Sequence, residues 1–150
     1  MIGEGELKSE CMKVACELGI SDAVEFLGKR STQYVRDAMT SASVFVQHSV
    51  TSTTGDKEGW PVAVAEAAAS GLPIVATRHA SLPEQVLHEE SGVLVDENDW
   101  RAMAKAMIRL AEDANLRRRM GEAARNHLSS FDVNLQIESL EKVLVQAGQK

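Results

Sequence analysis

The chain has 150 residues, of which 44% are hydrophobic and 25% charged, and its formal net charge is −6 at pH 7. This length and composition fit one globular domain and exclude a disordered or fibrous chain. The acidic balance argues against general nucleic-acid binding, which needs a basic face, and no apolar run approaches the roughly 20 residues of a membrane-spanning helix.

The two cysteines indicate a reduced protein. Cys11 and Cys16 lie five positions apart in one predicted helix and therefore face different sides, which disfavours a disulfide. Two cysteines alone cannot form a zinc site. The first ten residues lack the basic start and apolar core of a signal peptide, so we expect a cytoplasmic protein.

Strands and helices alternate along most of the chain. The predicted strands are 1–3, 23–28, 43–49, 74–77 and 92–96, and the predicted helices are 4–19, 31–42, 60–70, 81–91, 99–113, 114–131 and 132–148. Ser31 or Thr32, Asp99 and Asn115 are the predicted N-caps. The alternation predicts an α/β fold, a doubly wound parallel sheet covered by helices on both faces. We expect one domain over residues 1–150, with a helical tail, 99–150, packed on it.

The helix that starts near Pro61 carries the predicted binding site. In a doubly wound sheet, ligands bind beyond the carboxyl ends of the strands, and a helix N-terminus there receives phosphate. Glu66 interrupts the small apolar residues of this helix, and a buried carboxylate needs partners. Two vicinal hydroxyls of a ribose would supply them, and Glu58, in the preceding loop, would hold hydroxyls of a sugar. His48 ends a predicted strand at the same rim, where it could contact the ligand.

These segments resemble a known family. "EGWPVAVAEAAASGLPIVAT", "SLPEQV", "SGVLVDENDWRAMAKAM" and "RRRMGEAARNHLSSFD" are similar to the C-terminal, donor-binding domain of retaining glycosyltransferases with the GT-B fold. The most similar subgroup is family 4 of the sequence classification, which makes exopolysaccharides, lipopolysaccharide and related glycans. The resemblance implies a Rossmann-like half of such an enzyme, and it spans nearly the whole chain.

The resemblance also implies roles for individual residues. Glu58 matches the catalytic glutamate that lies against the transferred sugar, and Glu66 matches the glutamate that binds the ribose. The other implied donor-binding residues are Gly3 in the first turn, Gly59, Trp60 and Val62 around the sugar and pyrophosphate, and Lys29, Arg30 and Ser31 beside the base. His48 is a donor-binding candidate from its place at the strand end alone. A nucleoside diphosphate sugar is the implied substrate, with no metal and no other cofactor.

One part of the family pattern has no match in this chain. Members of the family carry an earlier strand with a glycine-arginine turn and a downstream lysine, which supply two cations for the pyrophosphate, and an N-terminal domain that binds the acceptor. We therefore expect a chain that is truncated on its N-terminal side and inactive alone, with peripheral membrane contact at most through the absent domain. The central first strand would also be missing, which predicts a homodimer or strand exchange at the open edges.

Two other functions are compatible with the sequence. A non-catalytic module that holds a nucleotide or nucleotide sugar beside a partner chain would need the same glutamates. A flavin or dinucleotide site would need a G-x-G-x-x-G turn after the first strand, whereas "GEGELK" supplies only its first half.

Overall fold

A computed structural model describes residues 1–148 and divides the chain into two compact units, Met1–Thr40 and Ser41–Lys150. The first unit contains helix α1 (Lys8–Glu17), a 3-10 turn (Ser21–Ala23) and nearly all of helix α2 (Thr32–Ser41). The second contains the sheet and the remaining helices. That both units form one domain stays a prediction.

In the first unit, the two predicted strands pair without forming regular strands. The amide of Leu27 donates to the carbonyl of Met1 at 2.9 Å, and the amide of Gly3 donates to the carbonyl of Gly28, also at 2.9 Å. In a regular parallel pair, the amide of Gly3 would donate to the carbonyl of Leu27 instead. Gly28 has a φ of +66°, so the chain turns away at this residue and the pairing stops.

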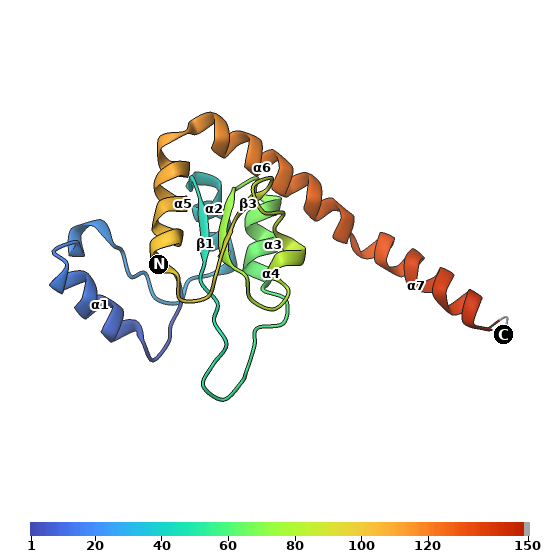
Figure 1. Ribbon diagram of the computed structural model, residues 1–150, viewed down its shortest axis with the longest axis horizontal. Coiled ribbons are helices and arrows are strands. Elements are labelled where there is room, and N and C mark those ends of the chain that lie inside the picture. The colour runs from blue at the N-terminus through green and yellow to red at the C-terminus, as the bar shows by residue number, and fades with distance from the viewer. Residues whose placement is uncertain (149–150) are drawn as a thin grey trace. The chain divides into compact units, whose positions relative to one another are not determined.

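The second unit contains a three-stranded parallel sheet in the order β1-β2-β3. Its strands are β1 (Phe45–Gln47), β2 (Ile74–Thr77) and β3 (Gly92–Val95), and its helices are α3 (Val62–Ala69), α4 (Leu82–Gln85), α5 (Trp100–Glu112), α6 (Ala114–Leu128) and α7 (Val133–Gly148), with a 3-10 turn at Ser129–Phe131. Val75 pairs with Val46 on one side and with Val93 on the other. The predicted α/β fold with a parallel sheet and a helical C-terminal region is confirmed (Figure 1).

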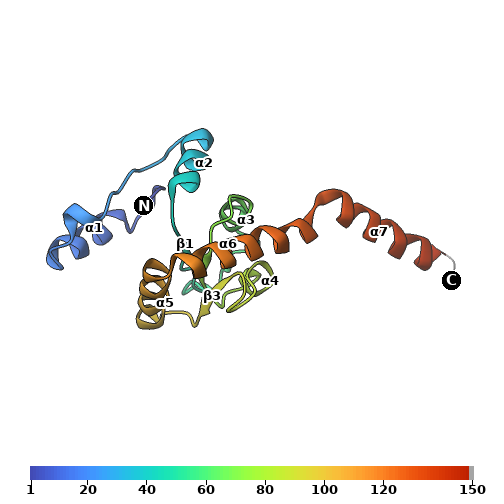
Figure 2. The same ribbon diagram turned by 90° about the horizontal axis from the view of Figure 1, so that it is seen from above.

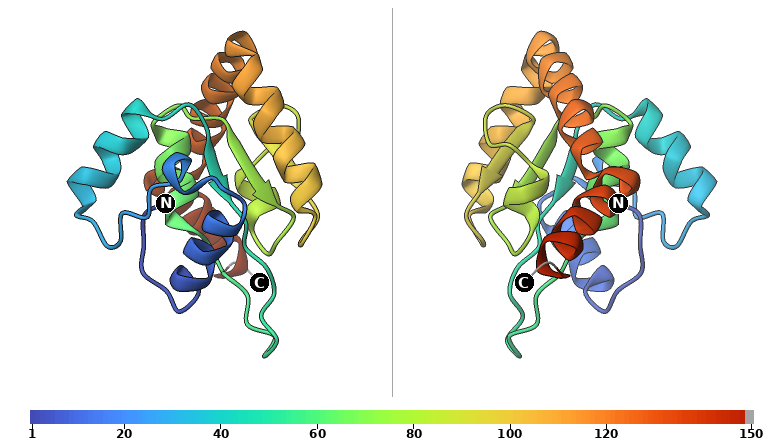
Figure 3. Two further views of the ribbon diagram at one scale, coloured as in Figure 1. Left: turned by 90° about the vertical axis from the view of Figure 1, so that its left-hand side faces the viewer. Right: turned by 90° about the vertical axis from the view of Figure 1, so that its right-hand side faces the viewer.

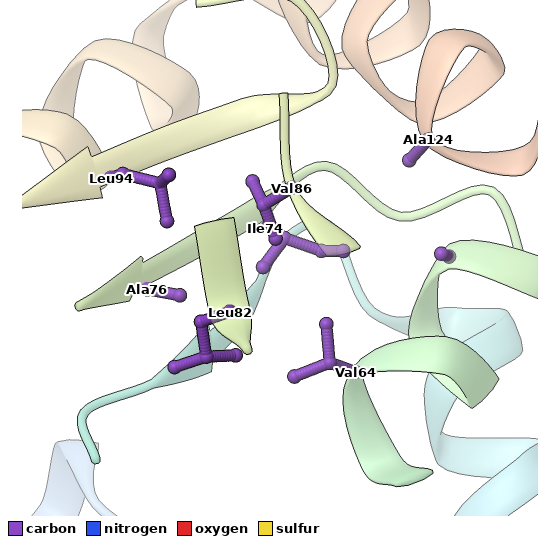
Figure 4. Close-up of a cluster of buried hydrophobic side chains, with 8 residues drawn as sticks. Val64, Ile74, Ala76, Leu82, Val86, Leu94 and Ala124 are labelled. Atoms are coloured by element: carbon purple, nitrogen blue, oxygen red, sulfur yellow. The ribbon is translucent and has the colours of Figure 1, made fainter. Parts of the chain in front are cut away.

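The two faces of the sheet bury two separate apolar clusters. Ile74 and Ala76 of β2 point to one face, where Val64 of α3, Leu82 and Leu94 join them (Figure 4). The other face has its own cluster, made by Val75, Val93, Val95, Ala106, Leu110, Leu116 and Met120. Both faces are covered, which explains why all four residues of β2 are buried. Each large aliphatic side chain buried in this way contributes about 1.5–3 kcal/mol to stability.

Helix α6 lies beside both α3 and α5, and Ala124 on α6 joins the α3 cluster (Figure 2). The helix that follows is different, because every side chain from residue 133 to 147 on α7 is exposed. Within the predicted helical tail, α5 and α6 therefore pack on the sheet, and the described side chains of α7 do not.

Three local predictions can be compared with the structure. Ser31 and Asp99 are confirmed as N-caps, since their side chains accept the amides of Tyr34 and Ala102 at 3.2 and 2.9 Å. The prediction that Asn115 is an N-cap is wrong. Helix α6 begins at Ala114 and is capped by Asp113, whose carboxylate accepts from the amide of Leu116 at 2.8 Å.

The helix predicted over 81–91 is also too long. Helix α4 ends at Gln85, because Val86 turns to an extended conformation and is fully buried against the sheet. Glu89 then has a φ of +64°, which a helix does not allow.

Gly121→Ala is expected to destabilise the second unit. A Cβ atom at this position of α6 would lie 2.0 Å from the carbonyl oxygen of Gly71, which follows α3. Both groups are backbone, so the helix would have to move, and overpacking of this kind costs about 1–3 kcal/mol or more. Urea denaturation measures the loss. Glu122→Ala, on the exposed side of the same helix, is the control and should change stability by less than about 0.5 kcal/mol. Equal midpoints for the two variants would contradict the packing argument.

Candidate functional site

The N-terminus of α3 offers unpaired backbone donors. Pro61, the residue before the helix, has a φ of −67° and contributes no N–H group. Among the described residues 1–148, no group accepts a hydrogen bond from the amides of Val62 or Ala63. These two donors, together with the positive end of the helix dipole, form a receptor for an anion.

Glu66 lies in the second turn of this helix. Its side chain is half-buried, and within residues 1–148 its carboxylate makes no hydrogen bond or ion pair. The sequence argument expected an enclosed carboxylate, and the structure corrects this point. Because water still reaches the group, the carboxylate needs no protein partner, and both of its oxygens are open to a ligand.

Glu58 lies in the long loop that joins β1 to α3 and extends beyond the carboxyl end of β1 (Figure 3). The side chain is exposed, but one oxygen is held in place. Oε2 accepts from the hydroxyl of Ser49 at 2.6 Å and from the side-chain amide nitrogen, Nε2, of Gln47 at 3.2 Å. Nothing among the described residues bonds to Oε1, which leaves that oxygen oriented and free to accept a ligand hydroxyl.

Gly59 and Trp60 connect Glu58 to the helix. The carbonyl of Gly59 accepts a hydrogen bond from the hydroxyl of Ser81. The indole of Trp60 packs against Phe131, with ring centroids 5.0 Å apart. The Trp60 ring therefore has a packing contact, and that its main chain lines a binding site stays a prediction from the resemblance.

His48 lies at a cavity that is separate from the two glutamates. It is exposed and lines a cavity of about 250 Å³ at the carboxyl end of the sheet, together with Thr77, Trp100 and Met103. The lining of this cavity includes neither Glu58 nor Glu66. Its predicted contact with a donor therefore stays a prediction.

The remaining predicted residues lie in the first unit. Gly3, whose φ is +135°, bonds to the carbonyl of Gly28, which directly precedes Lys29. The guanidinium carbon of Arg30 lies 5.1 Å from the centroid of the Tyr34 ring. The hydroxyl oxygen of Ser31 is occupied as the cap of α2. The structure thus brings Gly3 and residues 29–31 together within one unit.

Sequence reasoning missed the residues that hold the Glu58 loop. His79, only 1% exposed, accepts a hydrogen bond at Nε2 from the amide of Glu58, with the two nitrogens 3.2 Å apart. Its Nδ1 lies 2.7 Å from Oε1 of Glu97, and Oε2 of Glu97 accepts from the amide of Thr51 at 2.9 Å. Two hydrogen bonds lower the pKa of Glu97 below its ordinary value: the bond from the Thr51 amide has the larger effect, and the bond from His79 has the next largest. The one available signal was a histidine two residues after a buried strand, and Thr51 and Glu97 carried none.

Among residues 1–148, no three His, Cys, Asp or Glu side chains gather closely enough to hold a metal ion. In the same part of the chain, none of the helices combines the length and the apolar character needed to cross a bilayer.

Similar proteins point to one family. The chain is 34% identical over 112 residues to the amylovoran biosynthesis glycosyltransferase AmsK of Erwinia amylovora, covering 75% of this chain and 28% of AmsK. It is 33% identical over 149 residues to the putative colanic acid biosynthesis glycosyltransferase WcaL of Escherichia coli, covering 96% of this chain and 37% of WcaL. The chain thus spans about a third of the length of these curated relatives.

The fold also matches a solved structure. Anabaena HepE, crystallised in complex with UDP, superposes with a TM-score of 0.81 over 97% of this chain and 40% of HepE, at 22% sequence identity. The family described as "Glycosyl transferases group 1" matches residues 1–127. The chain therefore belongs to the group 1 glycosyl transferases.

Proposed function

We propose that this chain is the donor-binding part of a glycosyltransferase that moves a sugar from a nucleoside diphosphate sugar to a glycan or lipid-linked acceptor, with retention of configuration. One observation carries the proposal. The amides at the start of α3 lie between two carboxylates in sequence, Glu58 before them and Glu66 after them, and within residues 1–148 these amides and at least one oxygen of each carboxylate have no protein partner. An elongated ligand with phosphates at its middle fits that order.

The chemistry assigns a task to each group. As the bond between the sugar and the diphosphate breaks, negative charge develops on the leaving phosphate oxygens. The amides of Val62 and Ala63 donate to that charge, and donors fixed in advance stabilise a transition state. Oε1 of Glu58 accepts from hydroxyls of the transferred sugar, and Glu66 accepts from the ribose.

The rest of the donor site would come from the first unit and from a longer protein. Gly3 and residues 29–31 would line the nucleotide, and His48 would reach the donor from the rim of the sheet. The curated relatives are about three times longer than this chain, and an acceptor-binding domain would account for much of that length. Alone, the chain would bind donor without turnover, as a cytoplasmic protein, and β1, an edge strand of the sheet, would be open to pairing.

The names of the relatives favour one biological setting. AmsK and WcaL are named for the synthesis of amylovoran and colanic acid. We therefore propose that the sugar is transferred during exopolysaccharide or lipopolysaccharide synthesis. HepE was crystallised with UDP, which makes UDP and its sugars the first ligands to test.

Calorimetric titration of the 150-residue chain tests the proposal. The ligands are UDP, UDP-glucose, UDP-galactose, GDP and GDP-mannose, with NAD as the control for a dinucleotide site. We expect one of the two nucleoside diphosphates, together with at least one of its sugars, to bind with a stoichiometry of one. No binding by any of the five, or tighter binding of NAD, would overturn the proposal.

A further inference from the structure

The loop that carries Glu58 has little packing of its own. Residues 50–60 are all exposed, so few apolar contacts fix their conformation. Hydrogen bonds hold the loop instead: some lie within it, some come from Gln47 and Ser49 at its start, and others join it to the turns that follow β2 and β3. His79, two residues after the end of β2, is the buried side chain that bonds directly to the backbone of Glu58.

The hydrogen bonds define the protonation state of His79. A backbone amide can only donate, so Nε2 of His79 must carry a lone pair toward the amide of Glu58. The ring proton is then on Nδ1, where it is donated to Oε1 of Glu97 at 2.7 Å. His79 is therefore a neutral imidazole in its Nδ1–H form, oriented by a carboxylate, and its acceptor nitrogen faces the loop.

Glu97 is itself held at the other end of the loop. Its two oxygens accept from the amide of Thr51 at 2.9 Å and from the Thr51 hydroxyl at 3.3 Å. A continuous chain of hydrogen bonds thus runs from Thr51 through Glu97 and His79 to Glu58. It joins the two ends of the loop across the buried imidazole.

We propose that His79 is a positioning residue for Glu58, an inference that rests on the proposed function. By accepting the Glu58 amide, His79 fixes the backbone from which the carboxylate projects, while Ser49 and Gln47 orient the carboxylate itself. His79 would touch neither sugar nor nucleotide. Its effect should be confined to the ligand group that Glu58 contacts, the transferred sugar.

Two substitutions separate the two bonds of the imidazole. In His79→Asn, the side-chain NH2 can take the place of Nδ1 and keep the bond to Glu97, but nothing accepts the Glu58 amide. In His79→Gln, the side-chain oxygen reaches the place of Nε2 and can accept that amide again. We expect His79→Asn to weaken UDP-glucose binding about tenfold, the effect of one lost hydrogen bond to an oriented group, with UDP affinity unchanged. His79→Gln should restore most of the loss.

Two measurements make the test independent of activity. Nitrogen-15 NMR of the wild-type imidazole should show the Nδ1–H form, and hydrogen exchange at the Glu58 amide should be faster in His79→Asn than in the wild type or His79→Gln. An Nε2–H imidazole, or equal loss of UDP and UDP-glucose affinity in a folded His79→Asn variant, would overturn the role of His79. If the wild type bound GDP and GDP-mannose instead, the same comparison is made with those two ligands. If it bound none of the five nucleotide ligands, the proposed function would fall, and so would positioning for a sugar, while exchange at the Glu58 amide would still show whether His79 holds the loop.

Discussion

Glu66→Ala is expected to abolish measurable binding of UDP while leaving the fold intact. In the proposed complex, the two ribose hydroxyls donate to this carboxylate, and hydrogen bonds to a charged group each contribute about 1.5–3 kcal/mol. Losing both weakens binding about a hundredfold or more. The protein itself should not suffer, because Glu66 is half-buried and has no partner among residues 1–148. Calorimetry with UDP measures the affinity, and thermal unfolding checks the fold.

A ligand lacking one hydroxyl makes this test specific to the ribose. The wild type should bind 2′-deoxyuridine diphosphate about tenfold more weakly than UDP, whereas a Glu66 variant that retains weak binding should no longer distinguish the two. Glu66→Gln, which keeps one acceptor oxygen, should lie between the wild type and Glu66→Ala. Glu122→Ala, an exposed glutamate on α6, is the matched control and should bind UDP normally. Unchanged UDP affinity in folded Glu66→Ala would rule out the ribose role.

The sequence predicted the sheet and its long helices well where local pattern and burial agree. β2 covers residues 74–77 as predicted, because a short β-branched run bounded by Pro73 and Arg78 suits a strand buried on both faces. The prediction failed at 81–91, where Leu82 and Val86 stand four positions apart, the spacing of one face of a helix. There the burial of Val86 against the sheet overrides the local preference and ends α4 after one turn.

The site could be predicted only in part, for a related reason. Glu58 and Glu66 stand out because carboxylates near an apolar helix start demand an explanation. The residues that hold Glu58 do not stand out, since His79 and Glu97 lie 21 and 39 positions away in the chain and meet it only because parallel strands end at one edge. Such contacts between distant residues leave no periodic signal in a single sequence.

Glu58→Ala is expected to weaken UDP-glucose binding about tenfold and to leave UDP binding within about twofold of the wild type. In the proposed complex, Glu58 contacts the transferred sugar and Glu66 contacts the ribose, so loss of Glu58 should affect only ligands that carry the sugar. Oε1 of Glu58 has no hydrogen-bond partner among residues 1–148, and in the proposed complex it lies next to the transferred sugar, where bare UDP has no group to reach it. Calorimetric titration of one protein preparation with both ligands gives the ratio directly.

The control has to separate loss of the Glu58 carboxylate from general loosening of its loop. Asp56→Ala removes an acidic side chain from the same exposed loop, and with it the bond from the hydroxyl of Thr54 at 2.6 Å. It should leave the preference for UDP-glucose over UDP unchanged. Equal losses of UDP and UDP-glucose in Glu58→Ala would mean that Glu58 serves the diphosphate or the loop. If Asp56→Ala instead matched Glu58→Ala in both ligands, the conformation of the loop, and not a contact from Glu58, would set the affinity for the sugar.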